Sequence, residues 1–377
     1  MVLTLADVMP SVAASFGVGT GANPLALEPN RDVVVLLVDG LGAELLARHA
    51  DVAPTLAARV QGTMRAGFPA TTATSLTSLA VGAPCATHGV IGYSFALPEP
   101  DGRRTLNALR WRFDTADGID ARDIAEPETV QPVASRLEHL VAASVDVHYV
   151  VPGYQARSGL TRAAFRATGT VHPAATLDEL RDGILAVARH DGHDRRFAYA
   201  YYPDLDMHGH IHGPGSPEWL AVLRDVDAFA ADLFTDLPPT CTVLITGDHG
   251  MIRAGNTVDL DAAPDLHRDV ALIAGEARVR HVYVDRAGAS ADVATTWASH
   301  LGADARVVTR EQAVDEHWFG PSAPDPDIAA RIGDVIAVAE GTAVLVRPAA
   351  EPMESAMTGH HGAWTDDEQA VPLITSR

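Results

Sequence analysis

One uninterrupted aliphatic run limits what this chain can fold into. Residues 33–38 are all Val or Leu, and they lead directly into Asp39 and Gly40. A strand that is apolar on both faces must be covered on both faces, which is typical of a parallel sheet between helix layers. The following residues, 41–60, have apolar side chains at helical spacing and predict a helix. The run is far shorter than the ~20 residues of a membrane span, so no transmembrane helix or membrane partner is expected.

The same order of a buried strand, a loop and a helix returns along the chain. Further apolar strands are predicted from about residue 145, at 197–202 and at 242–246. This alternation predicts an α/β fold with a largely parallel central sheet and helices on both faces. Ligands of such sheets gather at the carboxyl ends of the strands. Asp39, Asp206 and Asp248 lie at or just past these ends, so we expect the functional site there.

Two segments depart from this pattern. Residues 271–346 predict a smaller α/β insertion or cap, with strands at 281–285 and 305–309 and a helix at 291–301. Residues 98–128 are rich in Asp, Arg and Gly and predict a second, irregular insertion. The catalytic core is therefore expected to comprise residues 30–270 and 347–377.

The net charge of the chain limits the kinds of molecule that it is expected to bind. The chain has 28 basic and 49 acidic residues and a formal net charge of −21, which repels a nucleic-acid polymer. A small phosphate ester can still bind where metal ions supply local positive charge. Cys85 and Cys241 cannot build a disulfide framework, and no basic residue precedes Arg31 in the apolar N-terminal stretch. Both features favour a cytoplasmic location.

One short segment is dense in possible metal ligands. Two carboxylates and three histidines lie within nine residues, namely Asp204, Asp206, His208, His210 and His212. Imidazole nitrogens together with carboxylate oxygens suit zinc or a similar divalent ion. The alternative is an exposed, inert histidine-rich loop.

Two further segments offer ligands. Asp248 and His249 follow a predicted strand and stand between two glycines, which allow a tight turn. Alone they could be a helix cap and a surface histidine, but with Asp39 at another strand end a shared metal site is the better interpretation. Near the C-terminus, His360 and His361 precede a predicted helix, and either could complete a metal site.

The helix predicted after His361 and an earlier predicted helix both begin with residues that are typical of a helix N-terminus. Thr365 with Glu368 predicts a capping box. Earlier, six hydroxyls lie within eight residues before an apolar stretch, namely Thr71, Thr72, Thr74, Ser75, Thr77 and Ser78. One of them could simply cap the helix. Alternatively, one could face an anion at the helix N-terminus and act as a nucleophile once a metal lowers its pKa.

In this order along the chain, the four segments resemble the nucleotide pyrophosphatase/phosphodiesterase branch of the alkaline phosphatase superfamily. The resemblance implies an alkaline-phosphatase-like fold and two divalent metal ions, with zinc expected and manganese as the alternative. It implies one metal held by Asp206, His210 and His361, and the other by Asp39, Asp248, His249 and the Thr72 oxygen. It leaves His208, His212 and His360 without a role.

The resemblance also implies a reaction. Thr72 would attack a phosphodiester or nucleotide pyrophosphate, and water would hydrolyse the phospho-threonine intermediate. The family places an asparagine three residues after this nucleophile, and here Ser75, beside Thr74, takes that position as the expected substrate-binding residue. Further candidates to hold a phosphoryl group are Arg110, Arg157 and Arg162.

Other functions stay open at this point. Within the superfamily these are a phosphomonoesterase, a phosphonate hydrolase and a phosphomutase. A sulfatase is disfavoured, since threonine cannot be oxidised to the aldehyde that a cysteine or serine gives. A non-catalytic metal-binding relative would lack a ligand or the nucleophile, whereas every one of these positions is filled here.

Overall fold

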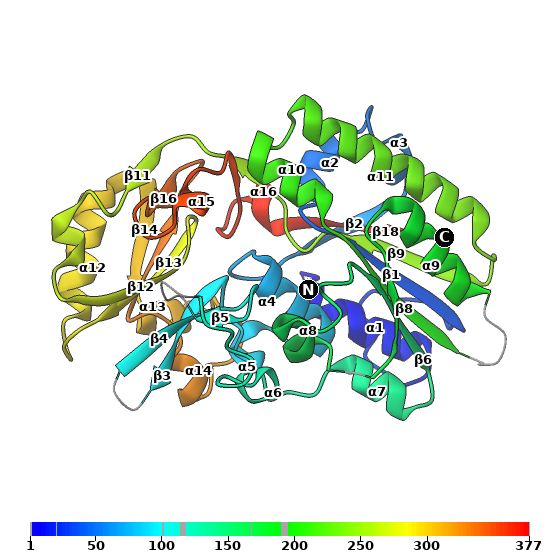
Figure 1. The fold of residues 1–377 in the computed structure, drawn as a ribbon, viewed down its shortest axis with the longest axis horizontal. Coiled ribbons are helices and arrows are strands. Elements are labelled where there is room, and N and C mark those ends of the chain that lie inside the picture. The colour runs from blue at the N-terminus through cyan, green and yellow to red at the C-terminus, as the bar shows by residue number, and fades with distance from the viewer. Residues whose placement is uncertain are drawn as a thin grey trace.

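The main sheet of the molecule has seven strands in the order β2-β18-β9-β1-β8-β6-β7 (Figure 1). The computed structural model describes residues 2–19, 21–99, 102–113, 118–166, 168–189 and 195–376. The strands are Asp32–Val38 (β1), Val60–Arg65 (β2), Asp146–Val151 (β6), Thr170–Pro173 (β7), Arg196–Tyr202 (β8), Cys241–Thr246 (β9) and Ala370–Thr375 (β18). β9, β1, β8, β6 and β7 are parallel, whereas β18 runs antiparallel to β9 and β2. The predicted α/β fold with a largely parallel sheet is confirmed.

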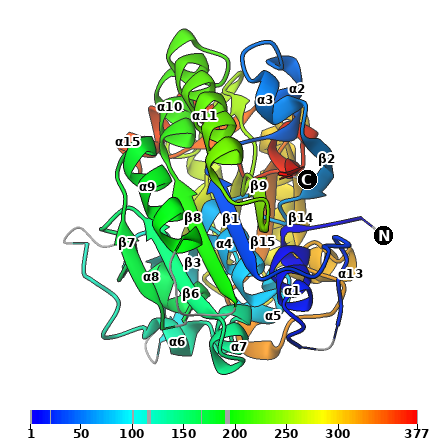
Figure 2. The same ribbon diagram turned by 90° about the vertical axis from the view of Figure 1, so that its right-hand side faces the viewer.

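The central strand β1 separates two hydrophobic cores. Val33, Val35 and Leu37 face one core, and the alternate residues of the strand face the other. The first core is covered by the helices Val8–Ser15 (α1), Thr72–Val81 (α4), Arg136–Ala142 (α7) and Gly159–Ala164 (α8). The second core is covered by Ala43–Arg48 (α2), Pro54–Ala57 (α3), Leu177–Ala188 (α9) and Pro217–Asp236 (α11). Figures 1 and 2 show these helix layers on opposite faces of the sheet.

The single helix predicted for residues 41–60 is wrong. The structure forms α2 and α3 in its place, and β2 begins at Val60. Pro54 is the first residue of α3. A proline has no N–H to continue a helix but fits well at a helix start, so the chain turns before it.

A second, four-stranded antiparallel sheet lies beside the main sheet, on the left of Figure 1. Its strands, in the order β12-β13-β15-β14, are Val270–Glu276 (β12), Val279–Val284 (β13), Ala305–Thr309 (β14) and Val335–Ala339 (β15). The helix Ser290–Leu301 (α12) packs on it through Trp297 and Val293. These elements coincide with the segment in which the sequence predicts an insertion, and the domain boundaries themselves stay a prediction.

The segment predicted as an irregular insertion contains regular structure. Ser94–Glu99 (β3), Gly102–Asn107 (β4) and Arg112–Phe113 (β5) form a small antiparallel sheet. Residues 100, 101 and 114–117 of this segment lie outside the described residues.

The remaining elements are short. The helices are Leu5–Asp7 (η1), Cys85–His88 (α5), Pro127–Val130 (α6), Asp204–His212 (α10), Pro264–His267 (η2), Gly302–Asp304 (η3), Arg310–Asp315 (α13), Pro326–Ala329 (α14), Pro352–Ser355 (α15) and Asp366–Gln369 (α16). The strands are Ile252–Arg253 (β10), Thr257–Asp259 (β11), Val344–Val346 (β16) and Gly359–His360 (β17). Within the described ranges, no helix is both long enough and apolar enough to cross a membrane. Cys85 and Cys241 are buried and are not joined in a disulfide, and the cytoplasmic location stays a prediction.

The buried side chain of His88, which contacts Ser78 of α4, predicts that the stability of the protein depends on pH. His88 Nδ1 accepts a hydrogen bond from the Val90 N–H at 3.2 Å, and its Nε2 lies 2.9 Å from Ser78 Oγ. Burial, helped by the charge of Arg331, lowers the pKa of His88 to about 3. The unfolded chain takes up this proton near pH 6.5, whereas the folded protein does not. Between pH 7 and pH 5, we therefore expect His88 to reduce the free energy of unfolding by about 2 kcal/mol.

Urea unfolding of the wild type and of His88→Gln at both pH values measures this effect. The substitution itself is expected to destabilise the protein at pH 7, so the comparison uses each protein's loss between the two pH values. Equal losses in the two proteins would contradict the assignment.

Candidate active site

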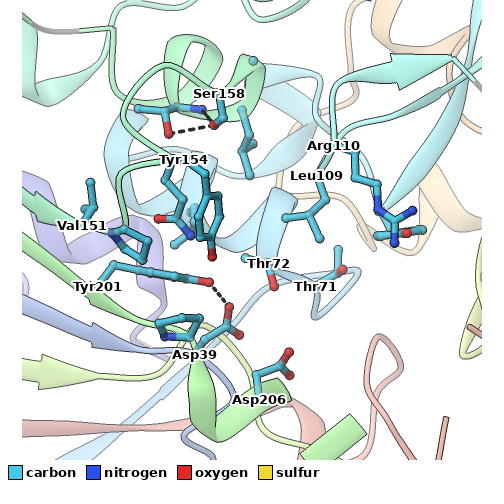
Figure 3. Close-up of a pocket in the computed structure, with 18 of the residues that line it drawn as sticks. Asp39, Thr71, Thr72, Leu109, Arg110, Val151, Tyr154, Ser158, Tyr201 and Asp206 are labelled. Carbon is cyan, nitrogen blue, oxygen red and sulfur yellow. Dashed lines mark hydrogen bonds between the residues drawn. The ribbon is translucent and has the colours of Figure 1, made fainter. Parts of the chain in front are cut away.

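The carboxyl ends of β1, β8 and β9 meet at one edge of the sheet, and the predicted ligands lie there. Figure 3 shows three of them, Asp39, Thr72 and Asp206. Asp39 directly follows β1, and Asp248 lies just past the end of β9. Helix α10 starts right after β8 and brings two more side chains to the same place. The structure thus brings together Asp39, Thr72, Asp206, His210, Asp248, His249 and His361.

Two glycines permit the close approach of these segments. Gly40 has a φ of +74°, and a Cβ added to it would lie 3.0 Å from the Cα of Asp206. A Cβ on Gly250 would lie 2.0 Å from the backbone oxygen of Asp367, where no side chain fits. Glycine is required at both positions because the backbones are in contact.

The first cluster of ligand atoms comprises Asp39, Asp248 and His249. His249 Nε2 lies 3.4 Å from Asp39 Oδ1 and 3.6 Å from Asp248 Oδ2. The hydroxyl oxygen of Thr72 is 3.2 Å from the same nitrogen. One ligand atom from each of the three residues lies within 4.8 Å of the others, a spacing from which one ion could be bound.

The second cluster is centred on Asp206. Its Oδ2 is 3.2 Å from His210 Nε2, and its Oδ1 is 3.9 Å from His361 Nε2. His249 also lies within 4.8 Å of Asp206 and His361, and the rings of His249 and His361 stack at a centroid distance of 3.5 Å. The two ligand sets implied by the resemblance are therefore adjacent, and His249 stands between them.

All three histidines are oriented in the same way. Their Nδ1 atoms bond to backbone carbonyls, His210 to Gly359 (2.8 Å), His249 to Gly250 (2.9 Å) and His361 to Ala70 (2.9 Å). A carbonyl only accepts, so each Nδ1 carries a hydrogen, and Nε2 is the nitrogen that can offer a lone pair to a metal. Each Nε2 faces the carboxylates, as in histidines that bind metals.

The three aspartates each have an oxygen that the protein does not satisfy. Asp39 Oδ1, Asp206 Oδ1 and Asp248 Oδ2 are buried without a hydrogen-bond partner among the described residues. Burial and the neighbouring charges of Asp248 and Asp206 raise the pKa of Asp39 well above its usual value. Three carboxylates this close are ionised together only if a cation offsets their repulsion. Divalent metal ions fit this set of donors.

The histidines differ in charge. Burial disfavours the proton on His210, but the adjacent carboxylate of Asp206 outweighs burial and raises the pKa to about 9. In His361, burial and then the neighbouring His249 lower the pKa well below its usual value. A metal at Asp206 would therefore displace a proton from His210.

A cavity of about 1200 Å³ opens from the cluster. Thr72 lines it, whereas Asp248 and His249 lie fully buried behind it. In Figure 3, Tyr154 and Leu109 lie above Thr72 on the side away from Asp206. An organic group attached to a phosphate can therefore lie between apolar walls.

The predicted substrate-binding hydroxyls lie elsewhere. Thr74 is buried and donates to the Val90 carbonyl at 3.1 Å, and Ser75 is buried inside α4. Neither lines the cavity, but Leu76 does. Residues four apart share a helix face, so Leu76 stands beside Thr72.

The three candidate arginines differ in their position relative to the cavity. Arg110 and Arg162 line the cavity, but Arg157 does not. Arg162 is paired with Glu128 at 2.7 Å, and Arg110 lies 3.6 Å from Glu354. The guanidinium groups of Arg110 and Arg162 thus already have acidic neighbours.

The structure adds two residues that the motifs did not indicate. The hydroxyl of Tyr201 donates a hydrogen bond to Asp39, and Glu276 of β12 accepts one from Thr71 at 3.0 Å. Tyr201 is the residue before the last in a predicted buried strand, so its position was a usable signal. Glu276 lies in β12, in the segment predicted as an insertion and far from the motifs, and nothing in the sequence pointed to it.

The histidines left without a role, His208, His212 and His360, are absent from the groups of possible ligand atoms among the described residues, although His360 lines the cavity and its ring centroid lies 6.5 Å from that of His210. The rings of His208 and His212 lie 5.6 Å apart on α10. His360 Nε2 is 3.1 Å from the Met357 carbonyl.

Comparison with known proteins identifies relatives. The model of the family described as type I phosphodiesterase / nucleotide pyrophosphatase matches residues 33–364. An uncharacterised pyrophosphatase/phosphodiesterase of Schizosaccharomyces pombe is 24% identical over 257 residues, which are 65% of this chain and 49% of the relative. The chain thus spans about half the length of the curated relative that it matches.

Solved structures share the fold. Murine ectonucleotide pyrophosphatase/phosphodiesterase 5 has a TM-score of 0.69 at 16% identity, with 91% of this chain and 87% of that chain covered. An inactive variant of the murine protein in complex with AMP gives 0.68, with the same identity and coverage. Phosphonoacetate hydrolase from Sinorhizobium meliloti in complex with phosphonoformate gives 0.68 at 17% identity, covering 92% and 90%.

Proposed function

Because the chain belongs to the type I phosphodiesterase / nucleotide pyrophosphatase family of the alkaline phosphatase superfamily, we propose that it hydrolyses phosphodiesters or nucleotide pyrophosphates with two divalent metal ions. The observation that carries the proposal is the position of Thr72. Thr72 lines the cavity, and its hydroxyl stands 3.2 Å from His249, which belongs to both groups of possible metal-ligand atoms. Mixed His and Asp ligands favour zinc, with manganese as the alternative.

The ligands would divide as the resemblance implies. One ion would be held by Asp206, His210 and His361, and the other by Asp39, Asp248, His249 and Thr72. Bound metal ions lower the pKa of a hydroxyl and offset charge on phosphoryl oxygens.

Thr72 then performs the chemistry in two displacements. Its Oγ attacks phosphorus, the P–O bond to the leaving group breaks, and a phospho-threonine forms. Water then attacks the same phosphorus, the bond to Oγ breaks, and Thr72 regains a proton. Thr72 is the first residue of α4, where the positive end of the helix favours the phosphoryl anion.

A small nucleotide is the proposed substrate class. The AMP complex of the murine variant supports it, and the net charge of −21 disfavours a polymer. Phosphonate hydrolysis is the second candidate, because phosphonoacetate hydrolase resembles this fold as closely as the murine protein does. The family match favours the diester.

Three substrates on one metal-loaded sample test this proposal. We expect bis-p-nitrophenyl phosphate to give a kcat/KM at least about tenfold above p-nitrophenyl phosphate and a p-nitrophenyl phosphonate monoester, since tenfold is ~1.4 kcal/mol of transition-state binding. The release of p-nitrophenol measures all three reactions. A preference for the monoester would replace the proposed substrate class, and no turnover of any would contradict hydrolysis itself.

A further inference from the structure

Glu276 reaches the candidate active site from the four-stranded sheet. It is the last residue of β12, and it lines the same cavity as Thr72. Its Oε2 accepts the hydrogen bond of Thr71 Oγ1 at 3.0 Å. Thr71 is the residue immediately before α4, so this bond ends one residue away from the proposed nucleophile.

Because of this hydrogen bond, Thr71 does not have the usual role of a threonine just before a helix. A threonine before a helix normally accepts a hydrogen bond from an N–H of the first turn. Thr71 has the extended backbone of such a cap but makes no side-chain cap bond. Its hydroxyl donates to Glu276 instead, so the entry of the chain into α4 depends on a residue of another sheet.

The other side of the Glu276 carboxyl group lies close to the backbone of Gly362, although its Oε1 has no hydrogen-bond partner among the described residues. A Cβ on Gly362 would lie 3.1 Å from its Cδ and 3.2 Å from its Oε1. Gly362 follows His361, and its carbonyl accepts the hydrogen bond of the Ala70 N–H at 2.9 Å. Glu276 therefore lies where the segment with the nucleophile meets the segment with the late histidine.

We propose that Glu276 is a positioning residue, which holds Thr71 and through it the first turn of α4, so that Thr72 faces the reacting phosphorus. The expected effect of Glu276 on kcat rests on the proposed function. Its expected effect on the position of Thr71 and α4 does not, because the Thr71–Glu276 hydrogen bond is a property of the protein alone.

A double-mutant cycle tests the expected effect on kcat. Glu276→Ala and Thr71→Val should each lower kcat about tenfold with KM within about twofold, and the double variant should lose no more than either one. Glu276→Gln and Thr71→Ser keep an acceptor and a donor, so they should retain most of kcat. Asp292→Ala, an exposed change on α12 beside the same sheet, is the matched control and should match the wild type.

Amide hydrogen exchange tests the expected effect on position without turnover. In the metal-free protein, peptides that cover residues 70–78 should exchange faster in Glu276→Ala and Thr71→Val, but not in Glu276→Gln. Additive kinetic losses, or wild-type kcat and exchange in Glu276→Ala, would overturn the inference. If the wild type hydrolyses no substrate, the proposed function fails while the exchange result still decides the position of Glu276.

Discussion

Thr72→Ala is expected to lower kcat by at least about a thousandfold, because removal of a nucleophile leaves only the residual effect of binding and electrostatics. Thr72 lines the cavity, and its hydroxyl lies 3.2 Å from His249, which belongs to both groups of possible ligand atoms. The six Asp and His side chains are untouched by the change. We therefore expect the variant to keep about two metal ions per chain, the number that a two-metal site requires.

Thr72→Ser is the matched control, since serine retains the hydroxyl and removes only a methyl group. It should keep a measurable part of the wild-type rate. Acid quenching during turnover should give a phosphopeptide that contains Thr72 in the wild type and none in Thr72→Ala. Retention of most activity by Thr72→Ala would remove Thr72 from the mechanism.

The parts of the site that the sequence predicted are those at strand ends. The continuous apolar run before Asp39 can only be a strand buried on both faces, and residues 242–246 before Asp248 follow the same rule. Parallel strands bring their carboxyl ends to one edge, so the two aspartates had to meet. A local pattern was sufficient here because the sheet itself makes the long-range contact.

The parts that the sequence did not predict depend on contacts between distant segments. The predicted capping box at Thr365 is an example. Its hydroxyl donates to Glu368 at 2.6 Å, but the Glu368 carboxylate is bound by Arg278 at 2.8 Å and by the Ala363 N–H at 2.9 Å. A buried ion pair with Arg278, in the turn between β12 and β13, replaces the local cap. Like Glu276, Arg278 belongs to the segment predicted as an insertion, where no periodic pattern indicates a partner.

The predicted role of Ser75 in substrate binding shows the same limit of prediction from the sequence. Counting along the chain placed it as the partner of the phosphoryl group, but the helix begins at Thr72 and directs Leu76 to the cavity. Of the arginines that line the cavity, Arg110 and Arg162 have glutamate neighbours. We therefore expect the metal ions, if bound at the two clusters, to supply much of the positive charge at the phosphoryl group.

Removal of the metal ions is expected to abolish hydrolysis and to destabilise the protein. The buried carboxylates of Asp39, Asp206 and Asp248 then face each other without a metal ion, and one oxygen of each has no protein partner in the described part of the chain. Restoring zinc to about a thousand times its dissociation constant should raise the free energy of unfolding by about 4 kcal/mol and recover activity. Activity assays and thermal unfolding before and after chelation measure both effects.

The same site predicts how zinc affinity changes with pH. Since Asp206 raises the pKa of His210 to about 9 in the metal-free protein, binding must displace that proton. Below this pKa the affinity should rise about tenfold per pH unit, and above it the increase due to His210 should end. Calorimetry in buffers of different ionisation enthalpy would detect the released proton.

A pair of substitutions on one helix separates this site from unspecific binding to histidines. His210→Ala should remove about one zinc ion per chain together with most of the activity, because an ion at Asp206 loses a ligand. His212→Ala, two residues further along α10 and outside both clusters, should change neither. Equal metal loss in the two variants, or hydrolysis that resists chelation, would contradict the two-metal site. If His210→Ala loses metal and His212→Ala does not, His212 is not a zinc ligand, and Asp206 with His210 is the place where the ion is bound.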